Sequence, residues 1–210
     1  MKAPLDPLSQ SLSRLSRALQ AQAGGHVRMK PFLAARGGRL EGDFEVRAAD
    51  GRVRRLQRAE LPLPSPLIRA FAHLAPAENL PIDLGSHRLT LWAPQELIEL
   101  QVGYRWHGFN GKRMREWDER YVVFAEDGGD PVALRVDEQD GPVWLSHRGE
   151  GRHLFFQAAP SLAAFYEAAA DWVETRDVAG LRQRLAGRLG EAAAELWIWK
   201  ELVSGTEARR

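Results

Sequence analysis

The clearest alternation of apolar and polar positions lies in residues 118–147. Three short apolar runs rich in Val, Tyr, Phe and Trp, at 121–125, 132–136 and 143–145, are separated by turn-forming clusters of Gly, Asp and Pro. Such runs are typical of consecutive strands in an antiparallel meander. A further strand is predicted at 152–157, so the second half of the chain indicates a sheet.

Two earlier segments have the pattern of hairpins. The apolar positions of the first surround an Asp-Gly turn at 50–51 and are Phe44, Val46, Val53 and Leu56. Asp-Gly favours a type I′ turn, because both central positions of that turn take a positive φ. The second hairpin is predicted over residues 80–92, with its turn at Gly85-Ser86.

Apolar residues that recur every three or four positions predict helices. The first stripe lies within residues 7–22 and consists of Leu8, Leu12, Leu15 and Leu19. Helices are also predicted at 66–74, 94–102 and 160–173, each opened by a proline. A final helix is predicted over 178–203, although Gly187 and Gly190 weaken its middle by about 1 kcal/mol each relative to alanine.

Together these elements predict an α+β fold in which a mostly antiparallel, twisted sheet is flanked by helices. The length suits one domain, predicted at 1–175, followed by a C-terminal helical extension at 176–210. This extension is expected to pack on the domain or on a second subunit, and the second arrangement would give a homodimer through the C-terminal helix.

Composition narrows the classes of function. The 210 residues include 29 basic and 28 acidic ones, and a net charge of +1 gives no global field for nucleic acid or a membrane surface. The absence of cysteine excludes disulfides, thiolate metal sites and cysteine nucleophiles. The N-terminus lacks the apolar segment of a secretory signal, and no apolar run reaches the roughly 20 residues of a membrane span. We therefore expect a cytoplasmic protein with no membrane partner.

The irregular segment 103–117 is the best candidate for a binding surface. It combines Trp, Tyr and Arg, the residue types that most often anchor protein interfaces, on a predicted loop. Its candidate partner-binding residues are Tyr104, Arg105, Trp106, Phe109, Arg113 and Trp117. The alternative is that Trp106 and Trp117 complete the core, because aromatic side chains supply a large buried area in either setting.

Acidic residues at the first turn of the meander form a second candidate. Glu126, Asp127 and Asp130 are expected to add electrostatic steering toward a partner. The alternative is a polar turn, in which Gly128 and Gly129 supply positive φ and Asp130 stabilises the turn. A phosphate loop is not predicted, since no Lys and Ser or Thr follow the glycines.

Other chemistry has weaker support in the sequence. His147 and His153 could face each other across a hairpin near the acidic turn and hold a metal, but the spacing of a two-histidine helix motif is absent. The Gly-x-Ser-x-Gly sequence of a nucleophile elbow is absent as well. We therefore expect no catalytic residue, no metal and no cofactor.

The first predicted hairpin carries a group of arginines. They are Arg47, Arg52, Arg54, Arg55 and Arg58. A patch of this kind could bind an anion or nucleic acid. A solvated strand face, protected from edge pairing by its charge, is the favoured interpretation, because neighbouring acidic residues offset the arginines.

The order of motifs in the second half of the chain resembles the SUKH superfamily, which contains bacterial toxin-immunity proteins and fungal cell-wall-synthesis regulators. The motifs are Tyr121-Val122-Val123-Phe124-Ala125-Glu126-Asp127-Gly128-Gly129-Asp130-Pro131, Gly141-Pro142-Val143-Trp144, His147 and Pro160-Ser161-Leu162-Ala163-Ala164-Phe165. The similarity covers residues 117–172. Leu61-Pro62 is a candidate for the Leu-Pro segment of the family, whereas the usual Asn-Gly-Gly stretch after it is missing.

The resemblance implies an α+β fold and activity by binding instead of catalysis. Members of the immunity type neutralise a toxin made by the same or a neighbouring cell, so the implied partner is a cognate protein toxin. Our first hypothesis is therefore a non-enzymatic immunity protein. A regulatory or scaffold protein of another complex, using the same sheet or the helix with Trp197 and Trp199, and a metal-dependent enzyme remain as alternatives.

Overall fold

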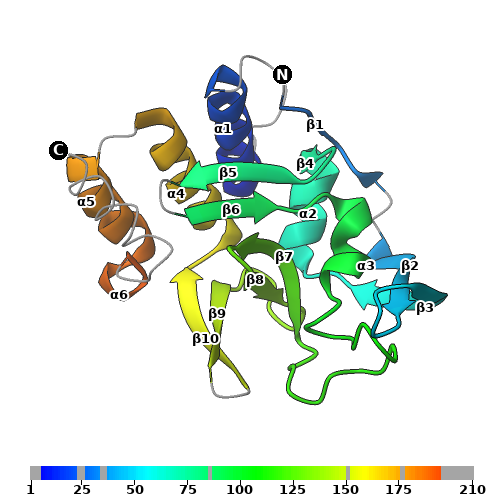
Figure 1. Ribbon diagram of the computed structural model, residues 1–210. Coiled ribbons are helices and arrows are strands. Elements are labelled where there is room, and N and C mark those ends of the chain that lie inside the picture. The colour runs from blue at the N-terminus through cyan, green and yellow to red at the C-terminus, as the bar shows by residue number, and fades with distance from the viewer. Residues whose placement is uncertain are drawn as a thin grey trace.

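A six-stranded antiparallel sheet forms the centre of the structure (Figure 1). The structure is a computed structural model and describes residues 6–22, 27–33, 37–84, 87–149, 152–175 and 178–194. The strands are β5 (Leu80–Leu84), β6 (His87–Leu91), β7 (Tyr121–Asp127), β8 (Asp130–Arg135), β9 (Val143–Gly149) and β10 (Arg152–Ala159). Their order in the sheet follows the chain, so the sheet is a meander. The predicted α+β class is confirmed.

Helices flank this sheet. They include α1 (Pro7–Gln22), α2 (Ser65–His73) and α4 (Leu162–Thr175). The predicted leucine stripe of α1 is confirmed, since each of its four leucines is at most 6% exposed. On α4, the Phe165 ring meets the Phe124 ring of β7 at 5.8 Å in an edge-to-face contact, and Trp172 Nε1 donates to the Asp83 carbonyl of β5 at 3.0 Å. None of the helices among the described residues has the length and apolar character needed to cross a membrane.

Smaller elements complete the structure. They are the pair β1 (Met29–Lys30) and β4 (Ala75–Pro76), the pair β2 (Arg39–Arg47) and β3 (Val53–Pro62), the 3-10 turn η2 (Pro94–Glu96), and α3 (Leu97–Leu100). The first predicted hairpin is confirmed, but it forms a sheet of its own and does not join the large one. Gly42 of β2 permits close approach to α3, because a Cβ at this position would lie 3.3 Å from Ile98.

The C-terminal extension corrects one prediction. The single helix expected over 178–203 ends at Leu189, and a second helix, α6 (Glu191–Ala194), follows α5 (Val178–Leu189). Gly190 takes φ +87°, and its N–H donates to the Ala186 carbonyl at 2.9 Å, which is a glycine stop at a helix C-terminus. Residues 195–203 lie outside the described part of the chain, so a homodimer through the last helix stays a prediction. The predicted Gly85-Ser86 turn also lies outside the described residues.

A buried charge cluster joins α1, α4 and α5. Asp171 of α4 is only 2% exposed, and its carboxylate accepts hydrogen bonds from Arg14 Nη2 at 2.7 Å and from Arg188 Nε at 2.5 Å. Arg14 also pairs with Glu174 and Glu167. The hydrogen bond to Glu174, followed by those to the other two carboxylates, raises the pKa of Arg14, so this guanidinium stays charged. A carboxylate this deeply buried requires such compensation.

Substitution of Asp171 by alanine should lower the free energy of unfolding by about 2 kcal/mol, because it removes the charge-assisted hydrogen bonds that Arg14 and Arg188 donate to the most buried carboxylate of the cluster. Chemical denaturation of the full chain measures this loss. The control is Glu174→Ala. The Glu174 side chain also pairs with Arg14 but is 37% exposed, so its removal should lower the free energy of unfolding by less than about 1 kcal/mol. Equal losses in the two variants would contradict the role assigned to Asp171.

Candidate protein-interaction surface

The β2–β3 hairpin is held against the rest of the structure through one of its faces. Phe44 and Val46 of β2 are 1% and 2% exposed. The Phe44 ring stacks on Trp106 at a centroid distance of 5.0 Å and an interplanar angle of 13°. Burial of these large side chains is the main force that fixes the hairpin.

A loop at residues 107–113 is bound to the same face of the hairpin. The Arg47 N–H donates to the Gly108 carbonyl at 2.8 Å, and Gln57 Nε2 donates to the Gly111 carbonyl at 2.9 Å. Gly111 takes φ +70°, and a Cβ there would lie 1.8 Å from Gln57 Oε1, so this position requires glycine. The loop is therefore ordered by specific contacts with the hairpin.

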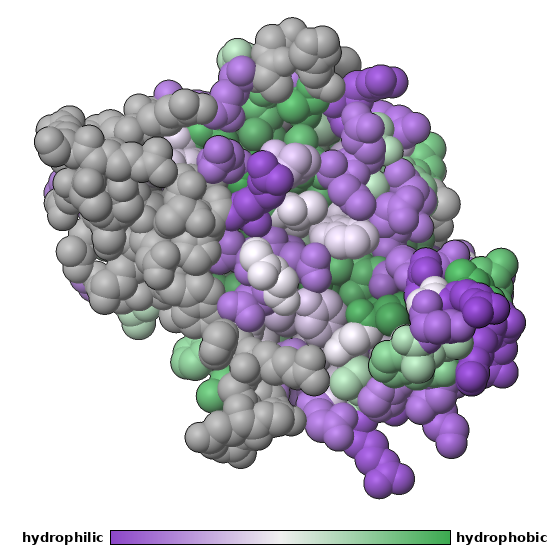
Figure 2. Space-filling view, viewed as in Figure 1, coloured by the Kyte–Doolittle hydropathy of each residue, from purple (hydrophilic) through white to green (hydrophobic). Residues whose placement is uncertain are grey.

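This loop presents Phe109, which at 66% is the most exposed large apolar side chain among the described residues. Arg55 Nη2 donates to the Asn110 carbonyl at 3.2 Å, which places Arg55 on the loop side of β3. We call Arg55, Phe109, Asn110 and Lys112 the Phe109 surface. Figure 2 shows apolar and strongly polar positions side by side at this end of the molecule.

Leu56 and Arg58 lie on the opposite side of the same strand, because side chains alternate along the regularly paired part of β3. Leu56 is 64% exposed, nearly as much as Phe109, and the Arg58 side chain is exposed as well. Both sides of the hairpin therefore carry an exposed arginine, but only the side of Arg55 is joined to the 107–113 loop. Residues on the side without the loop therefore serve as controls in tests of the Phe109 surface.

Three of the residues predicted to anchor a partner are buried. Arg105, Trp106 and Trp117 are 4%, 5% and 4% exposed, so the expectation that they line an exposed interface is wrong. Trp106 packs on Phe44, while Trp117 Nε1 donates to the Tyr121 carbonyl at 3.1 Å. The alternative, that the tryptophans complete the core, is the correct one. Phe109 and Arg113 are exposed as predicted.

Arg105 belongs to the same buried layer. Its Nη1 donates to the Glu119 carbonyl at 2.9 Å, and its Nη2 lies 3.8 Å from the Glu119 carboxylate. Desolvation lowers the pKa of Arg105, an effect opposed by Glu119 and reinforced by the positive charge of Arg113. The guanidinium thus fixes the end of the 103–117 segment and offers no surface to a partner.

The acidic turn behaves as a hairpin turn. Gly128 and Gly129 take φ +59° and +101° between β7 and β8, as the turn interpretation predicted. Asp127 is 3% exposed, so the expectation that it steers a partner from the surface is wrong. Glu126 and Asp130 are half-buried, and the Tyr104 hydroxyl lies 2.8 Å from both Glu126 Oε1 and the Gly129 carbonyl. Tyr104 therefore joins the irregular segment to this turn.

Gln101 is a positioning residue that the sequence interpretation missed. Its amide is fully buried: Nε2 donates to the Val123 carbonyl at 2.9 Å, and Oε1 accepts from the Val123 N–H at 3.2 Å. The Gln101 carbonyl also accepts from the backbone N–H groups of Tyr104 and Arg105. One residue thus fixes both β7 and the start of the irregular segment. The available signal was an amide that directly follows the mostly apolar segment 97–100.

The histidine hypothesis gains no metal site from the part of the chain that the structure describes, where no group of three His, Asp or Glu residues could hold an ion. The side chain of His147 lies outside the described set. His153 Nδ1 lies 3.1 Å from Ser146 Oγ, and the His153 ring meets Trp117 edge-on at 4.9 Å. Ser146 is fully buried, so this Ser-His pair cannot present its hydroxyl to a substrate.

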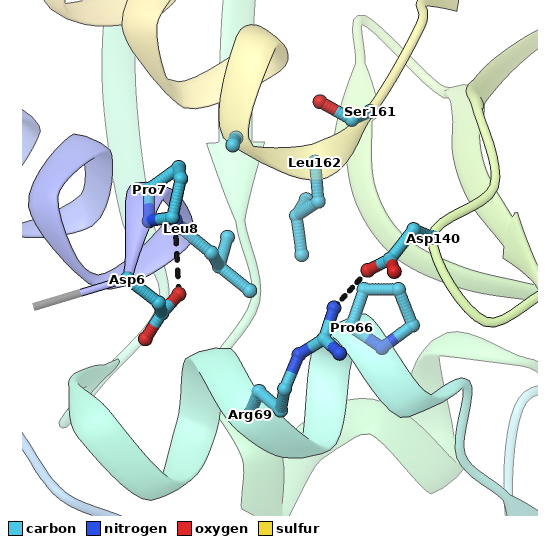
Figure 3. A pocket seen from close by; sticks show the side chains of 9 residues that line it. Asp6, Pro7, Leu8, Pro66, Arg69, Asp140, Ser161 and Leu162 are labelled. Atoms are coloured by element: carbon cyan, nitrogen blue, oxygen red, sulfur yellow. Dashed lines mark hydrogen bonds and ion pairs between the residues drawn. The ribbon is translucent and has the colours of Figure 1, made fainter.

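A cleft of about 540 Å³ lies where α1, α2 and α4 begin (Figure 3). Helix N-termini attract anions, but the polar groups here already serve the fold. Asp6 accepts from the Leu8 and Ser9 N–H groups at 3.1 and 3.2 Å, and Arg69 pairs with Asp140. With two carboxylates in its lining, one that caps α1 and one that pairs with Arg69, the cleft is a poor anion site.

Gln101→Leu should lower the free energy of unfolding by about 2 kcal/mol, because Val123 keeps a buried N–H and a buried C=O without their side-chain partner. Thermal or chemical denaturation measures this change. Gln95→Leu is the matched control: Gln95 is exposed and makes a hydrogen bond to the Ala77 carbonyl at 2.8 Å, so its loss should cost less than about 0.5 kcal/mol. A Gln101 variant as stable as the control would refute the positioning role.

Asp6→Ala should remove the cap of α1 and cost about 1 kcal/mol at neutral pH. A hydrogen bond from Ser9 is the main cause that lowers the pKa of the Asp6 carboxyl below 3.8, so its contribution is fully present above that pH and is lost as the pH falls through the lower, folded-state pKa. Denaturation at pH 7 and pH 3 should therefore show a smaller difference at pH 3. Asp140→Ala, at the exposed carboxylate of the same cleft, should change stability by less than about 0.5 kcal/mol.

Comparisons of this chain with protein-family models, curated proteins and solved structures find no match. The resemblance to the SUKH superfamily accordingly stays a prediction based on the motifs between residues 117 and 172.

Proposed function

We propose that this chain is a non-enzymatic protein-binding module that neutralises a bacterial toxin by binding to it. The observation that carries the proposal is Phe109, an aromatic side chain that is 66% exposed on a loop fixed by hydrogen bonds to the β2–β3 hairpin. The motifs that resemble the SUKH superfamily supply the class of partner, a toxin made by the same or a neighbouring cell. The proposal places the protein in the cytoplasm.

The physical basis is the small cost of ordering such a surface on binding. Association loses affinity when loops and side chains must be immobilised. Here the Arg47 and Gln57 contacts have already ordered the 107–113 backbone. Phenylalanine has only two rotatable side-chain bonds, so burying its ring in a partner converts most of the hydrophobic gain into affinity. A few aromatic and arginine residues of this kind carry most of the binding energy in protein interfaces.

A regulatory or scaffold role in another complex would use the same surface, and the partner distinguishes the two. A toxin gene beside the gene for this chain, and protection of cells from that toxin, support the immunity role. If no toxin gene lies beside it and the partner belongs to a housekeeping complex, the immunity role is wrong and the regulatory role replaces it.

Phe109→Ala should abolish protection when the variant is produced in bacteria together with the toxin encoded beside its own gene. Loss of a central aromatic anchor costs about 2 kcal/mol or more, so the Kd measured by calorimetry should rise about thirtyfold. Leu56→Ala is the matched control, since Leu56 is equally exposed on the other side of the hairpin and should leave protection unchanged. Full protection by the Phe109 variant would remove this residue from the interface.

A further inference from the structure

Arg55 and Lys112, the cations of the Phe109 surface, have no ion-pair partner among the described residues. Of the other five arginines of the hairpin, four are paired, and Arg54 is unpaired within the same described residues. Arg39 pairs with Glu60, Arg52 with Asp50, and Arg58 with Glu41. Arg47 pairs with Glu45, and Arg113 pairs with Glu119. Among the described residues, no carboxylate lies within ion-pair distance of Arg55 or Lys112.

The positive charge of Arg55 is nevertheless held in place. Its Nη2 donates to Gln57 Oε1 and to the Asn110 carbonyl, both at 3.2 Å, and these acceptors are neutral. The Lys112 N–H donates to Asn110 Oδ1 at 2.8 Å, which fixes the backbone from which the Lys112 side chain extends. The contacts that order the loop around Phe109 thus also fix the Arg55 guanidinium and the backbone that carries Lys112.

We propose that the Phe109 surface binds an acidic protein surface, in which an apolar cavity receives the Phe109 ring and carboxylates beside it pair with Arg55 and Lys112. This inference deepens the proposed function by giving the chemistry of the partner, and it rests on that proposal for the identity of the toxin. Complementary charge at the edge of an interface mainly accelerates association, whereas the buried aromatic ring mainly slows dissociation.

A protein fits these observations better than a nucleic acid. Proteins that bind nucleic acid neutralise many phosphates with a broad basic surface. The hairpin has six arginines, but carboxylates offset Arg39, Arg47, Arg52 and Arg58 and would repel a phosphate backbone. The net charge of the whole chain is only +1. One exposed ring with two free cations matches a discrete acidic site and not an extended strand.

The first test compares two arginines, Arg55 and Arg58, on opposite sides of β3. Arg55→Glu should slow association with the purified toxin encoded beside the gene about tenfold in 50 mM NaCl, as measured by surface plasmon resonance. The effect should shrink in 500 mM NaCl, because salt screens exposed charges. Arg58→Glu makes the same change on the other side and should alter the rate less than twofold. Equal effects of the two variants would overturn the inference.

Lys112→Glu is a second test, because Arg55→Glu also removes hydrogen bonds that order the loop. The Lys112 side chain makes no hydrogen bond or ion pair within the described residues, so its reversal leaves the contacts that order the loop intact. It should slow association about tenfold at low salt while the melting temperature stays unchanged. An unchanged association rate for this variant would contradict the acidic-partner proposal even if Arg55→Glu were defective.

A photo-crosslinker separates failure of this inference from failure of the proposed function. Benzoylphenylalanine is placed at position 109 in one full-length variant and at position 56 in another, and adducts formed in cells are identified by mass spectrometry. A toxin that is neutralised but crosslinks only from position 56 overturns the surface assignment and leaves the immunity role intact. An adduct from position 109 to an acidic segment of another protein, without neutralisation of a toxin, overturns the immunity role and supports the acidic-partner inference. A nucleic-acid adduct or no adduct from position 109 overturns the acidic-partner inference.

Discussion

The amide of Gln101 is the contact on which the arrangement of this molecule depends. It forms both hydrogen bonds to the backbone of Val123, in the stretch of β7 where the register with β8 shifts. A strand with an irregular register leaves backbone groups that need partners, and an orphan group in the core costs more than most single contacts return. Because the Gln101 carbonyl also accepts from the start of the 103–117 segment, β7 and that segment are fixed together.

A series of contacts connects Gln101 in the core to the exposed loop that carries Phe109. Trp106 lies in the 103–117 segment that Gln101 fixes, and its ring stacks on Phe44 of the β2–β3 hairpin. The hairpin in turn bonds the 107–113 loop through Arg47 and Gln57. Phe109 is therefore exposed on a backbone that is connected to the core at every step, which is the arrangement that lets an exposed aromatic residue bind without first being ordered.

Charge is used in two opposite ways in this fold. Around Asp171, two arginines compensate one buried carboxylate and hold three helices together. Around Phe109, Arg55 is fixed by neutral acceptors, so its charge is placed but left uncompensated within the described residues. The first use stabilises the fold, whereas the second leaves an attraction to be completed by another molecule.

The sequence alone determined the regular part of this protein. Periodicity identified the leucine stripe of α1, the hairpins and the meander, because burial on one face of a helix or strand imposes a repeat that can be counted. Gly128 and Gly129 were interpreted correctly as a turn, since only the local backbone decides their conformation. Only the tertiary structure decided which aromatic and charged side chains are exposed. Trp106, Trp117, Arg105 and Asp127 have the composition of a binding site and yet are buried, while Phe109 is not. That choice depends on contacts such as Phe44 with Trp106, between residues far apart in the chain, and no local pattern encodes them.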